Sequence, residues 1–340
     1  MTELSQQSGL SQLSSSPPPP PVAGQAVVAL DGVHRSFGTT PALAGLSFEV
    51  PERTITVLLG PNGAGKTTCT RVITGALGPD AGRVRVFGLD PTVDGAEVRR
   101  QCGIVSAKPA LYDRLSGFDN LLYAAELYGL GRGQHARDRI EAASDRFGIV
   151  GALDAQVGGY STGMKTRLAL ARSVLHEPDL LLYDEPTSGL DPESSHAVLE
   201  LIREMTGEGN TVVMCTHLLL EAEGLADQVV MLQDGTSLVS GTPESLVRTY
   251  WPDETVLFDA EDRAALSMLA DEPGVLRLEH GPDGVTAAVD RVDRVADLVA
   301  ALAAAGVRVT RVDAERHSLE DLYFAVRRGS GDNRIGEVHG

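Results

Sequence analysis

The sequence predicts an α/β fold with a mostly parallel sheet, followed by a small α+β domain. From residue 26 to about 245, short apolar β-type runs alternate with amphipathic helical patterns, the rhythm typical of parallel sheets covered by helices. From residue 250 to 328 the order becomes β-α-β-β-α-β, which indicates a ferredoxin-like unit. Between a strand and a helix of the first region lies a glycine-rich segment. We therefore expect two domains, at residues 26–245 and 250–328.

Size, charge and cysteine content exclude several classes of protein. The 340 residues, 42% of them hydrophobic, suffice for two globular domains. A formal net charge of -18 argues against nucleic acid as the main partner, because an acidic protein has no broad positive surface to neutralise phosphates. Cys69, Cys102 and Cys215 are far apart and form no CxxC or histidine pattern, so neither a disulfide framework nor a zinc site is expected. Three unpaired cysteines fit a protein of the reducing cytoplasm best.

The chain ends and the apolar stretches predict no membrane span. The longest apolar stretches, such as residues 299–307, fall short of the roughly 18 residues that a span needs. The start, "MTELSQQSGL", has no basic or apolar region of a secretory signal. Residues 1–25, with "SSSPPPPP", predict a disordered tail of polyproline II character, with a proline-recognition ligand as the alternative. An amphipathic helix, "SLEDLYFAVRR", precedes a second disordered tail at residues 329–340.

The glycine-rich segment "GPNGAGKTT" follows an apolar strand at residues 54–59 and opens a helix that reaches residue 77. It fits the pattern GxxxxGK[ST], in which glycines let backbone N–H groups surround a phosphate. Lys66 would reach the β and γ oxygens of ATP, and the Thr67 hydroxyl would bind Mg²⁺. The predicted ATP-binding residues of this loop are Gly60, Pro61, Asn62, Gly63, Ala64, Gly65, Lys66, Thr67 and Thr68.

Two further strands end in polar residues. "DLLLYDEPTSGLD" places Asp184 and Glu185 at the end of the strand 180–183, where an open α/β sheet binds its ligand. We expect Asp184 to hold Mg²⁺ and Glu185 to act as the base or to position water for attack on the γ-phosphate. The strand "TVVMC" ends at Thr216 and His217. A lone histidine is more often structural, but its place at a strand end favours a catalytic role.

With these motifs in order, residues 26–245 resemble the nucleotide-binding domain of ATP-binding cassette (ABC) transporters, and the fold expected is the ABC-type P-loop NTPase. "LLLYDE" resembles the Walker B motif and His217 the switch histidine. Phe37 stands where the family stacks an aromatic ring on adenine, with core packing as the alternative. The segments that match the signature and the D-loop are Ser161, Thr162, Gly163, Met164 and Lys165, and Ser188, Gly189, Leu190 and Asp191.

The resemblance implies a dimer of nucleotide-binding subunits, either a homodimer or a heterodimer, that uses ATP and Mg²⁺. In the family the signature of one domain closes over the ATP held by the phosphate loop of the other. Ser161 and the backbone at Gly163 would then contact the γ-phosphate in trans. The alternative for this segment is an ordinary serine-capped surface helix.

Two residues depart from the family pattern. Lys165 replaces the usual glutamine, as in the signature variants of drug, antibiotic and lipid exporters. Ala107 stands where a glutamine that contacts Mg²⁺ and water is expected, and alanine can do neither. Either the neighbouring Lys108 contacts phosphate, or coupling depends on residues 110–129, whose apolar face would meet the permease. Lysine occurs only at positions 66, 108 and 165, all in nucleotide-associated segments.

The resemblance implies a cytoplasmic ATPase held at the inner face of the cell membrane by an integral membrane permease, with a drug, antibiotic or lipid as cargo. The ending "SLEDLYF" also resembles the daunorubicin-resistance-type ATPases. One alternative is a non-transport ABC protein, although no tandem cassette or coiled-coil insertion is present. Another is a ligand-regulated ATPase in which the C-terminal domain is a sensor; a spacer or dimer-stabilising role is the simpler reading.

Overall fold

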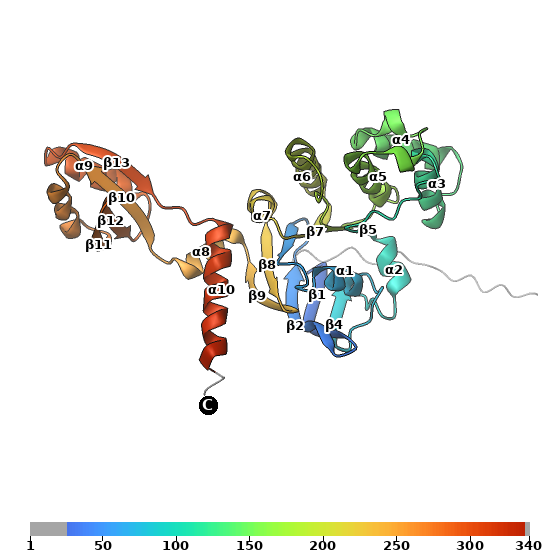
Figure 1. Cartoon of the computed structure of the whole chain (residues 1–340), viewed down its shortest axis with the longest axis horizontal. Helices are drawn as coiled ribbons and strands as arrows, with labels where there is room; N and C mark the ends of the chain where they lie inside the picture. The colour runs from blue at the N-terminus through green and yellow to red at the C-terminus, as the bar shows by residue number, and fades with distance from the viewer. Residues whose placement is uncertain (1–25, 337–340) are drawn as a thin grey trace, which may run out of the picture.

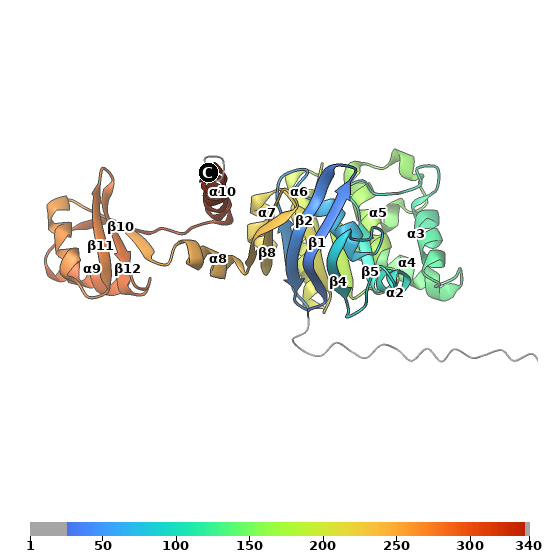
Figure 2. The ribbon, with the colours of Figure 1, turned by 90° about the horizontal axis from the view of Figure 1, so that it is seen from below.

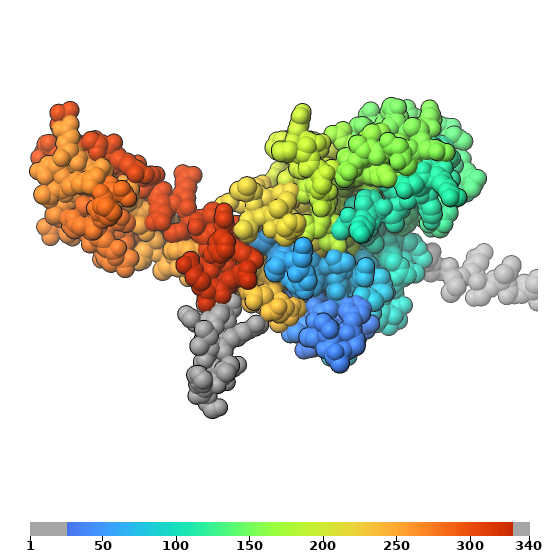
Figure 3. Space-filling view, viewed as in Figure 1, coloured from blue at the N-terminus to red at the C-terminus, as the bar shows by residue number. Residues whose placement is uncertain are grey.

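The computed structural model describes residues 26–336. The predicted tail at residues 1–25 and the last four residues of the second tail lie outside the described residues. In Figure 1 the larger α/β part and the smaller α+β part lie at opposite ends, with α8 and α10 between them. The space-filling view in Figure 3 shows the atoms of α10, in red, between the two parts.

A six-stranded sheet carries the predicted nucleotide motifs. Its order is β5-β6-β7-β3-β8-β9, in which only the β8–β9 pair is antiparallel, so the predicted α/β fold with a mostly parallel sheet is confirmed. Leu59 lies opposite Thr216, and Asp184 opposite Cys215, so β3, β6 and β7 end at the same edge. The strands are β3 (Ile55–Leu59), β5 (Cys102–Val105), β6 (Leu180–Asp184), β7 (Thr211–Thr216), β8 (Gln228–Gln233) and β9 (Thr236–Gly241).

An antiparallel sheet of order β2-β1-β4, whose strands lie side by side in Figure 2, packs against the parallel sheet and α1. Buried side chains of the antiparallel sheet, the parallel sheet and α1 form one hydrophobic core. Its members include Val28 of β1, Leu46 of β2, Leu58 of β3 and Ile73 of α1. The sequence predicted short β-type runs in this region but not that they form a separate antiparallel sheet. Its strands are β1 (Val28–Phe37), β2 (Thr40–Val50) and β4 (Ala81–Val86), and α1 spans Lys66–Ile73.

Helices cover the other face of the parallel sheet and form a second core, in which Leu121, Leu168 and Tyr183 are buried. In Figure 1, α3, α4 and α5 form a group beyond β5, on the side away from β9. Two short 3₁₀ turns lie at Val150–Ala152 and Val157–Gly159. The helices of this part are α2 (Gly95–Arg100), α3 (Gly117–Leu127), α4 (Gln134–Arg146), α5 (Thr162–Val174), α6 (Pro192–Gly207), α7 (Leu219–Leu225) and α8 (Pro243–Tyr250).

The smaller part has the ferredoxin-like strand order expected from the sequence. Its four strands pair as β11-β12-β10-β13, all antiparallel, over a separate core that includes Phe258, Leu266 and Leu302. The first connection was expected to be an α-helix but forms a 3₁₀ helix, η3 (Arg263–Asp271). A 3₁₀ helix rises more per residue than an α-helix, so these nine residues span a greater length of the sheet than they would as an α-helix. The other elements are β10 (Glu254–Ala260), β11 (Val275–Gly281), β12 (Gly284–Val289), α9 (Arg294–Ala304) and β13 (Val309–Ala314).

The last helix, α10 (Leu319–Gly336), returns to the larger part. Its buried residues Leu319, Leu322 and Val326 belong to the helical core of the larger part, and α10 packs on α7 and α8. The sequence analysis grouped this segment with the accessory domain, because an amphipathic pattern does not reveal which core a helix joins. The helix also continues past residue 328, where a tail was expected. The other domain boundaries remain predictions.

None of the helices within residues 26–336 combines the length and the apolar character that crossing a membrane requires.

Candidate nucleotide site

The glycine-rich loop is confined between β2 and the β8–β9 turn. A Cβ on Gly65, whose φ is +103°, would lie 2.6 Å from the Ala42 carbonyl oxygen. A Cβ on Gly60 would overlap the Leu232 carbonyl oxygen. Gly235, in the turn, donates its N–H to the Ala64 carbonyl at 3.2 Å. The close approach of neighbouring backbone therefore requires glycine at both loop positions. The hydrogen bond from Gly235 holds the loop against the β8–β9 turn.

Lys66 is the first residue of α1 and is only 6% exposed. Its Nζ donates to the carbonyl of Gly60 at 2.6 Å and to that of Pro61 at 3.3 Å. No side chain caps the start of α1, and its first turn has no acidic residue. The amino end of α1 and the buried ammonium thus present positive potential at the loop, which suits a phosphate.

Thr67 and Asp184 place two oxygen donors side by side. The Thr67 hydroxyl donates to Asp184 Oδ2 at 2.7 Å. Burial raises the pKa of the Asp184 carboxyl, and the hydrogen bond from Thr67 opposes this shift. Mg²⁺ prefers oxygen ligands and is commonly held through one or two carboxylates plus substrate phosphates. The hydroxyl and the carboxylate fit such an ion, and within residues 26–336 no cluster of three or more His, Cys, Asp or Glu side chains forms a richer metal site.

The carboxylate of Glu185 lies between the ammonium of Lys66 and the imidazole ring of His217. Its Oε1 is 3.5 Å from Lys66 Nζ, and its two carboxylate oxygens lie 3.0 and 2.8 Å from Nδ1 of His217. Its φ of +54° is in the left-handed region, a conformation that costs free energy for a residue other than glycine and often occurs at functional sites. The polar ends of β3, β6 and β7 therefore converge, as their parallel register requires.

The signature and the D-loop are neighbours within one chain. Ser161 caps α5, its hydroxyl accepting a hydrogen bond from the N–H of Met164 at 3.2 Å. A Cβ on Gly189 would lie 3.6 Å from the Thr162 methyl group. The D-loop begins close to Glu185, because the N–H of Ser188 donates to the Glu185 carbonyl at 3.1 Å. A short chain path thus links the carboxylate at the strand end to the signature.

Asp191 ends the D-loop by capping α6. Its carboxylate accepts from the N–H of Ser194 at 2.9 Å and from the Ser194 hydroxyl at 2.8 Å. These bonds lower the pKa of the Asp191 carboxyl. Leu190 lies between this cap and the signature, since a Cβ on Gly163 would be 3.8 Å from a Leu190 methyl group.

Phe37 ends β1 with its ring 48% exposed, so it is not a core residue. The guanidinium of Arg35 lies 5.4 Å from the centre of the ring. Asp80 holds this guanidinium through a 2.8 Å ion pair. The exposed ring is available for stacking, whereas the core-packing alternative is not supported. No motif in the sequence predicts this role of Arg35.

Ala107 and Lys108 are exposed in the loop after β5. Val105 lies opposite Tyr183, so this loop starts at the sheet edge that also carries Asp184 and Glu185. Lys66 pairs with Glu185 and Lys165 with Asp113, whereas Lys108 has no carboxylate partner among the described residues. The Lys108 ammonium is therefore free to approach a ligand at this edge.

The sequence analysis also missed Asp113, whose Oδ1 lies 2.9 Å from Nζ of Lys165 in the signature. The two residues are 52 positions apart, and no local pattern joins them. The "DG" turn at Asp234 and Gly235, which supports the phosphate loop, was equally overlooked, although such a dipeptide between two apolar runs is a recognisable hairpin signal.

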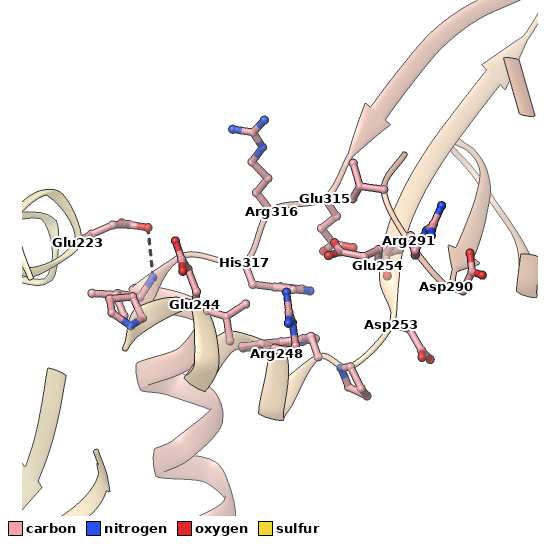
Figure 4. A pocket seen from close by; sticks show the side chains of 17 residues that line it. Glu223, Glu244, Arg248, Asp253, Glu254, Asp290, Arg291, Glu315, Arg316 and His317 are labelled. Carbon is pink, nitrogen blue, oxygen red and sulfur yellow. Dashed lines mark hydrogen bonds between the residues drawn. The ribbon is translucent and has the colours of Figure 1, made fainter. Parts of the chain in front are cut away.

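A cleft of about 960 Å³ lies away from this site, between α8 and the smaller part. Figure 4 shows Glu223, Arg248, Arg316 and His317 along it, contributed by α7, α8 and the segment before α10. His317 stacks on Trp251 with ring centres 4.0 Å apart, which joins the two connecting segments. None of the predicted nucleotide residues lines this cleft.

Comparison with known proteins agrees with this geometry. The ABC transporter family matches residues 43–188. The chain is 35% identical over 314 residues to the daunorubicin resistance ATP-binding protein DrrA3 of Streptomyces coeruleorubidus, covering 90% of this chain and 96% of that relative. The chain belongs to the ABC transporter ATP-binding family. It is an ATPase subunit that binds ATP, and the resemblance predicted from its motifs is confirmed.

Other similar proteins extend the comparison. The ATPase is 38% identical over 206 residues to the ABC transporter ATP-binding protein NatA of Bacillus subtilis (strain 168), covering 60% of this chain and 83% of that relative. It is 34% identical over 255 residues to Nod factor export ATP-binding protein I of Rhizobium sp. (strain N33), with 74% and 83% covered. A solved ATP-binding subunit of an ABC transporter superposes with a TM-score of 0.61 at 29% identity, covering 66% of this chain and 93% of that one.

Proposed function

We propose that this ATPase powers export of a drug, antibiotic or lipid-class compound through a separate integral membrane permease. The observation that carries the proposal is the convergence of Lys66, Thr67, Asp184, Glu185 and His217 at one sheet edge. Relatives named for daunorubicin resistance and for Nod factor export support an exporter. Similarity over most of the chain, including the smaller part, supports the drug-resistance type in particular.

The groups that converge at the sheet edge have distinct roles in hydrolysis. The loop N–H groups and Lys66 bind the phosphates, and Phe37 stacks on adenine. Thr67 Oγ1 and an Asp184 oxygen would hold Mg²⁺, which when bound neutralises phosphate charge. Glu185 takes a proton from the attacking water at a carboxylate oxygen, and His217 Nδ1 orients that carboxylate. Lys108, from the adjacent loop, reaches the γ-phosphate or its water in place of the missing glutamine.

A second copy of the chain, or a related subunit, completes the site. Ser161 and the amino end of α5 close over the triphosphate bound by the partner's phosphate loop. In this arrangement one chain supplies two half-sites. ATP binding closes the dimer, and hydrolysis with release of phosphate reopens it.

The permease contacts an exposed aromatic and aliphatic surface formed by α3 and the residues just before it. Tyr112 and Tyr123 are 52% and 43% exposed and meet edge to face, with ring centres 5.3 Å apart. Leu115 and Leu127 are also exposed here. An apolar surface of this kind fits a helix of a membrane protein that protrudes from the inner face of the membrane. In this proposal the ATPase lies in the cytoplasm and is held at the membrane by the permease. No nucleic acid is involved.

A mixed-dimer experiment tests the catalytic part of the proposal. A Lys66→Ala chain has no working phosphate loop, and a Ser161→Arg chain has no working signature, so each should be inactive alone. Mixing them should restore one intact site per heterodimer and part of the ATPase rate. Mixtures that form dimers by light scattering but stay inactive would refute the arrangement in trans.

Export requires a separate assay in cells. Co-expression of the ATPase with its permease should lower the cellular accumulation of a fluorescent drug such as an anthracycline, and the Glu185→Gln variant should abolish this effect. Equal accumulation with active and inactive ATPase would remove drugs of this kind from the cargo class.

A further inference from the structure

The segment that follows Ala107 and Lys108 is fastened to the helix that carries the signature. Nζ of Lys165 lies 2.9 Å from Oδ1 of Asp113, and Arg172 donates to the carbonyl of Ala110. Burial lowers the pKa of the Arg172 guanidinium. Lys165 and Arg172 are seven residues apart, about two turns of helix, so they point from one face of α5.

Ser161, whose hydroxyl caps α5, stands at the start of the same helix. Ser161 precedes Lys165 by one helical step of four residues, and the N–H of Lys165 donates to the Ser161 carbonyl at 3.0 Å. The positive charge of Lys165 therefore lies next to the part of α5 that closes over ATP in the partner copy. Asp113 is the carboxylate that pairs with this charge.

Backbone hydrogen bonds hold the rest of the segment beside the residues that precede Ser161. These bonds remain when the Asp113 side chain changes, because they use main-chain atoms only. They run from the N–H groups of Gly158, Val157, Gly117 and Phe118 to the carbonyls of Asp113, Leu115, Ala155 and Leu153, over 2.9 to 3.1 Å.

The carboxylate of Asp113 therefore holds the Lys165 ammonium but is not needed to hold the segment in place. Its side chain is 65% exposed and that of Lys165 is 32% exposed. An ion pair this exposed contributes little to folding stability. Its removal leaves the segment in place but frees the Lys165 ammonium, one helical turn after Ser161, from its fixed position.

We propose that Asp113 is a positioning residue for the signature: through Lys165 it fixes the face of α5 that closes over the partner's ATP. It thereby connects the loop beside a chain's own nucleotide to the nucleotide of the other chain. This inference rests on the proposed function, in which the signature acts in trans.

Mixed dimers test this directly, because they contain one composite site of known parentage. The first chain carries Ser161→Arg and supplies only the phosphate loop. The second chain carries Lys66→Ala and supplies only the signature. Asp113→Asn in the second chain should lower kcat about fivefold, or about 1 kcal/mol. The same change in the first chain should leave kcat within about 1.5-fold, since the signature of that chain is not used.

Two controls separate positioning from a structural effect. Glu126→Gln removes a comparable exposed ion pair, with Arg132 at the end of α3, and should have no effect in either chain. In the second chain, Asp113→Asn combined with Lys165→Met should cost no more than Lys165→Met alone, because the carboxylate acts only through that lysine.

Equal losses with Asp113→Asn in either chain would overturn the proposal, as would additive effects of the two substitutions. Inactivity of the mixed dimer with Asp113 intact would refute the arrangement in trans, and the proposal with it. That outcome is distinguishable because it appears before any substitution at Asp113 is made.

Discussion

Replacing Glu185 by glutamine tests the centre of the proposed mechanism. The substitution keeps the size and planar shape of the side chain but removes its charge and its capacity to take a proton. Loss of a positioned general base typically slows a reaction 10²–10⁴-fold, or about 2.7–5.4 kcal/mol. We expect kcat of Glu185→Gln to fall within this range.

ATP binding should change in the opposite direction. In the structure Lys66 Nζ is 3.5 Å from Glu185, so the carboxylate competes with phosphate for this ammonium. Both side chains are largely buried, 6% and 13% exposed, so the cost of desolvation offsets much of their attraction and the net contribution is on the order of 1 kcal/mol. Removing it should therefore leave the Kd for ATP unchanged or up to about fivefold tighter. Slow hydrolysis with firm binding should trap the closed dimer.

The assay combines three measurements on one variant: steady-state ATPase rate, ATP affinity by calorimetry, and mass by light scattering with and without ATP. Glu177→Gln is a matched control, because Glu177 also has a left-handed backbone (φ +52°) and an ion pair, with Arg139, but lies outside the site. Turnover at the unsubstituted rate would remove Glu185 from the catalytic role. A loss of ATP affinity that matches the loss of rate would show instead that the side chain serves binding.

Three other substitutions address the same sheet edge. Burial raises the pKa of Asp184, so the folded state binds more protons than the unfolded state and loses stability as pH rises through the raised value. Asp184→Asn should therefore raise the melting temperature of the nucleotide-free protein at pH 8 by more than at pH 4; an equal shift at both would contradict this cause. Lys108→Ala should lower kcat about tenfold, or about 1.4 kcal/mol, with KM for ATP little changed, whereas Ala107→Gln should be tolerated. Unchanged kcat in Lys108→Ala would make Lys108 an ordinary surface residue.

The part of the site that the sequence predicts well depends on local pattern and strand register. A strand, a glycine loop and a helix start are contiguous, so Lys66 and Thr67 could be placed from "GPNGAGKTT" alone. Parallel strands end at a common edge, so Asp184, Glu185 and His217 could be expected near them. The hydrogen bonds between Thr67 and Asp184 and between His217 and Glu185 realise that expectation.

Contacts between distant segments carry no such signal. Asp113 meets Lys165 because residues 113–118 run beside residues 153–158, an arrangement of two irregular segments that neither periodicity nor propensity encodes. The left-handed backbone of Glu185 is likewise set by its surroundings, with its N–H bound to the Cys215 carbonyl at 2.9 Å. Tertiary context decides both features.

The path of α10 changes how the smaller part must be regarded. Because α10 returns to α7 and α8, residues 254–314 form an insertion attached at both ends, whereas the sequence had indicated a domain appended at one end. The Trp251–His317 stack joins the two connections where they leave the larger part. Glu223, on α7, accepts the N–H of Leu319 at 3.3 Å. Since α7 begins two residues after His217, a displacement of α10 acts directly on the helix that follows the histidine bound to Glu185.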